Sequence, residues 1–269
     1  MPFLQTGPVK IHYEVSGEGP PLVLIPGWTL NTKLWDPVLP GLEGRFRVIR
    51  YDVRGAGLST SDPKLEHSRI ADADDLKALL DHLGLARAAL VGHSKGARIA
   101  LVFAMRWPDR VDAVVAAGSA EPRPERGTET TFSPIVAAWL DGVRETARRD
   151  GVDKALERLS RGRLFGKLRT SVEGMRILRR AMEGYRGADL LSDIPPRRFD
   201  AAHEYRRLTM PVLFLVGEED PFLSECRYAH QRLPTSSLQI VSGSGHMLPL
   251  EAPEAFTRAI LDFLSGSGS

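Results

Sequence analysis

The sequence is poor in the features that mark secreted and membrane-embedded proteins. Its 269 residues include one cysteine, Cys226, so no internal disulfide can form and nothing favours an oxidising compartment. No apolar run approaches the roughly 20 residues that cross a bilayer. Residues 1–10 lack the basic start and apolar core of a signal peptide. The sequence therefore predicts a cytoplasmic protein that has no membrane partner.

Positive and negative charges are nearly balanced over the whole chain. The formal net charge is +2, which is too small to indicate a nucleic acid as the partner. One segment departs from this balance, because residues 158–180 hold eight Lys or Arg and one acid, Glu173. We interpret this basic run as a solvated helix face, with steering of anionic substrates as the alternative.

The apolar residues that are present indicate an α/β fold. Six short apolar runs are typical of parallel strands covered on both faces: 22–25, 48–51, 88–91, 111–117, 212–216 and 238–241. Residues 9–15 alternate instead, as in an antiparallel strand with one solvated face. Helical spacing occurs at 70–83, 97–107 and 255–264. This alternation predicts a doubly wound, mostly parallel sheet with its ligand site at the carboxyl ends of the strands.

The alternation of strands and helices fails over residues 121–205, a segment too long for a simple connection. Its Arg, Leu and Ala content predicts several short helices. We therefore expect residues 1–120 and 206–265 to form the core and residues 121–205 to form an inserted helical cap. Residues 266–269, Gly-Ser-Gly-Ser, are expected to be a flexible tail.

A candidate nucleophile lies directly after the apolar run 88–91. Gly92-His93-Ser94-Lys95-Gly96 has the G-x-S-x-G pattern between a predicted strand and a predicted helix, which is the context of a nucleophile elbow. A sharp strand-to-helix turn crowds the backbone, and the glycines relieve that crowding because they lack a Cβ. Ser94 is therefore the predicted nucleophile; a serine that only caps the helix is the alternative.

A serine needs a base, and the base needs an orienting carboxylate. Among seven histidines, His246 is favoured because it follows the apolar run 238–241, on a loop at a strand's carboxyl end. Asp220 follows the run 212–216 in the same way, and the order Ser94, Asp220, His246 is the one typical of a nucleophile elbow. Glu121, after the run 111–117, is the alternative acid.

These motifs together resemble the α/β-hydrolase superfamily, especially its small bacterial esterases, enol-lactone hydrolases and cofactor-free haloperoxidase-like enzymes. The resemblance spans nearly the whole chain outside the predicted cap. It rests on Pro26-Gly27-Trp28, the stretch 52–59 (Asp-Val-Arg-Gly-Ala-Gly-Leu-Ser), the Ser94 elbow, Pro108-Asp109-Arg110-Val111, the stretch 217–220 and Gly245-His246.

The resemblance implies an oxyanion hole formed by the backbone N–H groups of Trp28 and Lys95. Pro26 departs from the family pattern, in which a histidine often stands at that position. Relatives such as haloalkane dehalogenases and epoxide hydrolases use an aspartate nucleophile, whereas position 94 here is serine. The expected activity is therefore hydrolysis of a small-molecule carboxylic ester or lactone through an acyl-enzyme.

Three alternatives stay open at this stage: hydrolysis of a carbon–carbon bond, perhydrolysis with the same triad, and a low-turnover ligand-binding receptor of this fold. The sequence contains no H-E-x-x-H motif and no phosphate-binding loop. It therefore implies no metal and no other cofactor. We expect a monomer or a homodimer.

Overall fold

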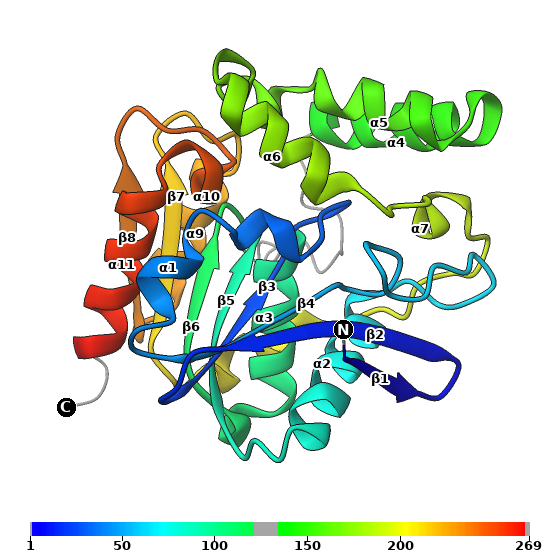
Figure 1. Ribbon diagram of the computed structural model, residues 1–269. Coiled ribbons are helices and arrows are strands. Elements are labelled where there is room, and N and C mark those ends of the chain that lie inside the picture. The colour runs from blue at the N-terminus through cyan, green and yellow to red at the C-terminus, as the bar shows by residue number, and fades with distance from the viewer. Residues whose placement is uncertain (1, 121–133, 267–269) are drawn as a thin grey trace.

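The computed structural model describes residues 2–120 and 134–266, which are built around an eight-stranded sheet (Figure 1). The order of strands across the sheet is β1-β2-β4-β3-β5-β6-β7-β8. β1 and β2 pair antiparallel, β2 also pairs antiparallel with β4, and the other pairs are parallel. The strands are β1 (Phe3–Thr6), β2 (Val9–Ser16), β3 (Pro21–Ile25), β4 (Arg47–Tyr51), β5 (Ala88–His93), β6 (Val111–Ala117), β7 (Val212–Gly217) and β8 (Ser236–Val241).

The predicted fold class is confirmed, since each of the six apolar runs lies within one parallel strand. β1 is an additional strand that the sequence analysis did not predict. β8 is the outer strand of the sheet, and its residues are half-buried or exposed. The expectation that all six runs are covered on both faces is therefore wrong for β8. At the edge of a sheet, the side chains of a neighbouring strand help to cover each face from one side only.

Helices cover both faces of the sheet. On β3, Val23 and Ile25 pack in a core with α2 and α3, whereas Leu22 and Leu24 pack in a second core with α11. The helices are α1 (Leu39–Leu42), α2 (Arg69–His82), α3 (Lys95–Arg106), α4 (Pro134–Asp150), α5 (Val152–Ser160), α6 (Val172–Met182), α7 (Ala188–Leu191), α8 (Ala201–Glu204), α9 (Leu223–Arg232), α10 (Leu248–Glu251) and α11 (Pro253–Gly266).

Helices α4 to α8 follow β6 and precede β7 in the chain. Figure 1 shows α4, α5 and α6 grouped beyond one end of the strands, apart from α2, α3 and α11, which flank the sheet. Asn31, in the loop after β3, ties this group to the core, because its backbone N–H donates to the Ala181 oxygen at 2.7 Å. The division into a core and a separate cap over residues 121–205 stays a prediction.

Within the described part of the chain, no helix combines the length and the apolarity needed to cross a bilayer.

Asp52, directly after β4, fixes the loops at this end of the sheet. Its carboxylate is buried and accepts hydrogen bonds from the backbone of Thr32 at 2.8 Å, the backbone of Leu58 at 2.9 Å and the His12 ring at 2.9 Å. A Cβ on Gly57 would lie 2.3 Å from Asp52 Oδ2, so only glycine fits there. The prediction of a solvated face on residues 9–15 is wrong at His12, which is buried beside Asp52.

Replacement of Asp52 is expected to destabilise the fold strongly, because two buried donors and one part-buried donor would lose their acceptor. We expect Asp52→Ala to lower the free energy of unfolding by about 3–5 kcal/mol, as measured by urea denaturation. Asp112→Ala is the matched control, because it removes a half-exposed acid paired with Arg87 and should cost less than about 1 kcal/mol. Equal effects of the two changes would contradict the role given to Asp52.

Candidate active site

Ser94 occupies a single-residue turn between β5 and α3. Its backbone angles, φ 54° and ψ −114°, lie in a region that residues with a side chain rarely adopt. The two flanking glycines make this turn possible: a Cβ on Gly92 would lie 2.2 Å from the Gly96 oxygen, and a Cβ on Gly96 would lie 2.0 Å from the Ile25 oxygen. The helix expected at residue 97 therefore begins at Lys95, immediately after the turn.

The structure brings Ser94, His246 and Asp220 together at the carboxyl ends of β5, β8 and β7. His246 Nε2 lies 3.0 Å from Ser94 Oγ, and His246 Nδ1 lies 2.9 Å from Asp220 Oδ2. His246 and Asp220 are buried, whereas Ser94 keeps partial exposure. Asp220 Oδ1 also accepts the backbone N–H of Phe222 at 2.9 Å, which fixes the carboxylate. The alternative acid, Glu121, lies outside the described residues.

Two residues that the sequence analysis did not assign to the site hold the loop of His246. His93 Nε2 donates to the His246 carbonyl oxygen at 2.9 Å, and the two rings contact each other at a tilt of 49°, with centroids 5.0 Å apart. Glu251 accepts the backbone N–H of Gly245 at 2.5 Å, and burial is the main cause that raises the pKa of its carboxyl. The position of His93 next to the predicted nucleophile was the only sequence signal for either residue.

The loop after β3 carries Trp28, one of the two predicted oxyanion donors. The Trp28 indole N–H donates to Asp189 Oδ2 at 2.6 Å, and the Tyr185 hydroxyl donates to Asp189 Oδ1 at 2.7 Å. Asp189 thus links α7 to this loop. Lys95, the other predicted donor, is the first residue of α3, where a helix has no internal acceptor for the backbone N–H.

Ser94 lies in the wall of a pocket of about 240 Å³. Most of the pocket's lining is apolar and comes from the core loops and the inserted helices: Trp28, Trp139, Leu140, Leu164, Leu190 and Phe222. From the basic run 158–180, Leu164 lines the pocket and none of the eight cations does. Among residues 2–120 and 134–266, no group of three or more His, Cys, Asp or Glu is arranged to hold a metal ion.

A mostly parallel sheet that presents a serine on a strand–turn–helix, with a histidine and an acid on the next loops, is the architecture of an α/β hydrolase. The family model for the alpha/beta hydrolase fold matches residues 20–253. The chain belongs to this family.

Individual relatives cover almost the full length of the chain. One from Caulobacter sp. (strain K31), which carries the name carbamate hydrolase RutD, is 30% identical over 99% of this chain and 100% of its own. The 2-(acetamidomethylene)succinate hydrolase of Mesorhizobium japonicum is 29% identical over 96% of this chain and 92% of its own. The solved structure of a thermophilic esterase from Thermogutta terrifontis has a TM-score of 0.82 and 28% identity, covering 97% of this chain and 95% of that one.

His93 is expected to make stability depend on pH. Burial, reinforced by the neighbouring His246, lowers the pKa of His93 to about 3. Between that value and about pH 6.5, the unfolded chain binds a proton at this position and the native protein does not, so stability rises with pH in this window. The contribution of His93 is about 1.4 kcal/mol per pH unit, and it should be missing from the urea-unfolding profile of His93→Gln. Parallel profiles for the two proteins would contradict the buried, neutral state.

Proposed function

We propose that this protein is a serine hydrolase that cleaves a carboxylic ester or a lactone through an acyl-enzyme. The observation that carries the proposal is the chain of contacts from Ser94 Oγ to His246 at 3.0 Å and from His246 to Asp220 at 2.9 Å. This geometry allows the base to take the serine proton while the buried acid holds the ring in the required tautomer.

The proposed reaction has two halves. His246 Nε2 takes the proton of Ser94 Oγ as the oxygen attacks the substrate carbonyl carbon, and the carbonyl oxygen becomes an oxyanion. The backbone N–H groups of Trp28 and Lys95 bind that oxyanion. The ester bond then breaks, the leaving alcohol takes the proton from His246, and an acyl group stays on Ser94. Water repeats these steps and releases the acid.

Three further observations support ester or lactone chemistry. The nucleophile position holds Ser94 rather than the aspartate that haloalkane dehalogenases and epoxide hydrolases of this fold use. The pocket beside Ser94 is mainly apolar, which suits the carbon chain of an ester or lactone. The similar structure from Thermogutta terrifontis is that of an esterase, which agrees with ester hydrolysis.

Ser94→Ala tests the nucleophile. We expect hydrolysis of p-nitrophenyl esters to fall by several orders of magnitude, and labelling by a fluorophosphonate to disappear, while the circular dichroism spectrum is unchanged. Ser224→Ala, which changes an exposed serine on α9, is the control and should keep wild-type activity. A folded Ser94→Ala protein with wild-type turnover would rule out the acyl-enzyme.

Asp220→Asn tests the orienting acid. The neutral amide does not stabilise the imidazolium, and its NH2 group can donate to Nδ1 and so favour the tautomer that has no free base at Nε2; we therefore expect kcat to fall on the order of 10⁴-fold. Glu121→Gln, the change at the alternative acid, should have little effect on the same assay. If Glu121→Gln is the more damaging change, the acid of the triad is Glu121.

A further inference from the structure

The pocket beside Ser94 has basic residues in its wall. Arg69 from the first turn of α2, Lys95 and Arg98 from α3, and Arg144 from α4 all line it. The acid that lines the pocket among the described residues is Asp189. Both oxygens of that carboxylate already accept hydrogen bonds, from Trp28 and Tyr185. The described residues that line the pocket therefore include four cations and one acid.

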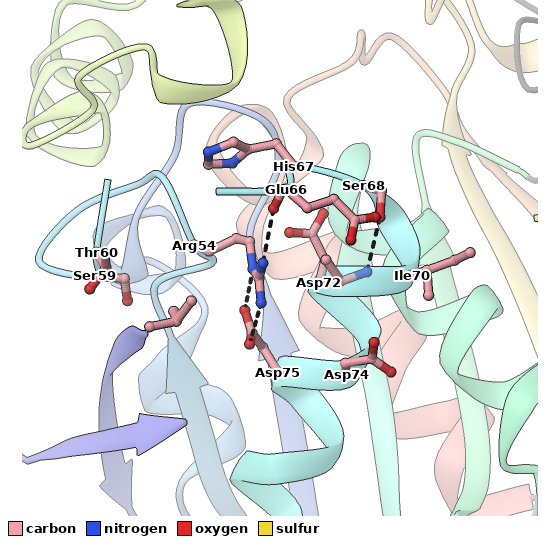
Figure 2. A network of polar contacts seen from close by, with 12 residues as sticks. Arg54, Ser59, Thr60, Glu66, His67, Ser68, Ile70, Asp72, Asp74 and Asp75 are labelled. Carbon is pink, nitrogen blue, oxygen red and sulfur yellow. Dashed lines mark hydrogen bonds and ion pairs between the residues drawn. The ribbon is translucent and has the colours of Figure 1, made fainter. Parts of the chain in front are cut away.

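The acid that balances Lys95 is Asp72, which is not among the residues that line the pocket. Lys95 Nζ is 3.0 Å from Asp72 Oδ2; the Lys95 side chain is 23% exposed, and that of Asp72 is 0% exposed. Figure 2 shows Asp72 in the first turn of α2, beside Arg54 and Asp75. Arg54 is bound by both oxygens of Asp75, at 2.6 and 2.7 Å. The charge of Asp72 is thus buried beside the Lys95 ammonium group, and the Lys95 side chain is part of the pocket's lining.

Arg98 lies one helical turn after Lys95 and is fixed in place. Its side chain is 7% exposed, its Nη2 is 3.7 Å from Glu225 Oε2, and its Nε donates to Ser119 Oγ at 2.9 Å. Ser119 also lines the pocket. A serine hydroxyl that accepts from a guanidinium keeps its own proton for a second partner. Arg98 and Ser119 together therefore form a preorganised donor pair in the wall that carries the nucleophile.

We propose that the substrate is an ester or lactone that carries a free carboxylate, and that Arg98, Lys95 and Ser119 bind this carboxylate while the apolar wall holds the carbon chain. The inference rests on the proposed function and adds the substrate class to it. The Arg98 and Lys95 cations complement a carboxylate in charge, and the guanidinium and the Ser119 hydroxyl can donate hydrogen bonds to it. The cations of the run 158–180 are not part of this site, since they do not line the pocket.

The kinetic test compares three p-nitrophenyl esters of similar length that differ in the terminal group: 5-carboxypentanoate, 5-carbamoylpentanoate and 6-aminohexanoate. We expect kcat/KM to be about tenfold or more higher for the carboxylate than for the amide at low salt, and lowest for the ammonium. The ratio of carboxylate to amide should shrink in 1 M salt, where the Debye length is about 3 Å. A ratio of one at low salt, or a preference for the ammonium, would overturn the proposal.

Variants locate the anion site. Arg98→Met keeps the length of the side chain without its charge, so the carboxylate-to-amide ratio should fall about tenfold. Ser119→Ala is the second variant: loss of Arg98 also leaves buried Glu225 without its cation, whereas loss of the Ser119 hydroxyl keeps that ion pair, and the ratio should again fall severalfold. Arg176→Gln, an exposed member of the basic run paired with Glu173, is the control and should keep the wild-type ratio. An equal loss in Arg176→Gln would assign the preference to the basic run instead.

A binding measurement separates this inference from the proposed function. Ser94→Ala protein is titrated calorimetrically with hexanoate, hexanamide and hexylammonium, none of which requires turnover. Hexanoate should bind about tenfold more tightly than hexanamide, and Arg98→Met should abolish the difference. An inactive enzyme with this binding order would refute the hydrolase proposal and leave the anion site standing. Active enzyme with equal binding of the three ligands would refute the anion site alone.

Discussion

The strained turn at Ser94 is the constraint on which the site depends. A residue with a side chain adopts φ 54° only where its surroundings enforce it, and here β5 and α3 leave space for one residue between them. The close approach of Gly96 to the Ile25 oxygen shows how tightly the helix start packs on β3. This packing points Ser94 out of the carboxyl edge of the sheet and places the free N–H of Lys95 beside it.

The loops that carry His246 and Asp220 are held by polar contacts, most of which are buried. Asp220 is fixed by a backbone N–H as well as by His246. His93, kept neutral by burial, anchors the backbone of the His246 loop without adding a charge to the site. Asp52 performs the same task for the loop after β3, at the cost of burying a carboxylate. Preorganisation of this kind reduces the reorganisation that the reaction requires.

The pocket has both apolar and basic lining residues, and these come from different parts of the chain. The inserted helices contribute Trp139, Leu164 and Leu190, which provide an apolar surface. The start of α2 contributes Arg69, and the start of α3 contributes Lys95, whose acid, Asp72, is buried. Lys95 is the first residue of α3, where a positive charge interacts unfavourably with the helix dipole. Asp72, from the neighbouring helix α2, balances this charge.

The sequence by itself determined the sheet, the elbow and the order of Ser94, Asp220 and His246, because strand burial and a sharp turn leave local signatures in residues that are adjacent in the chain. The edge position of β8, the burial of His12 and the part played by Glu251 were decided by tertiary structure. Lys and Arg are most concentrated along the sequence in residues 158–180, whereas the fold brings Arg69 and Arg98 to the pocket. Contacts between side chains far apart in sequence depend on how helices pack, and no local pattern records that packing.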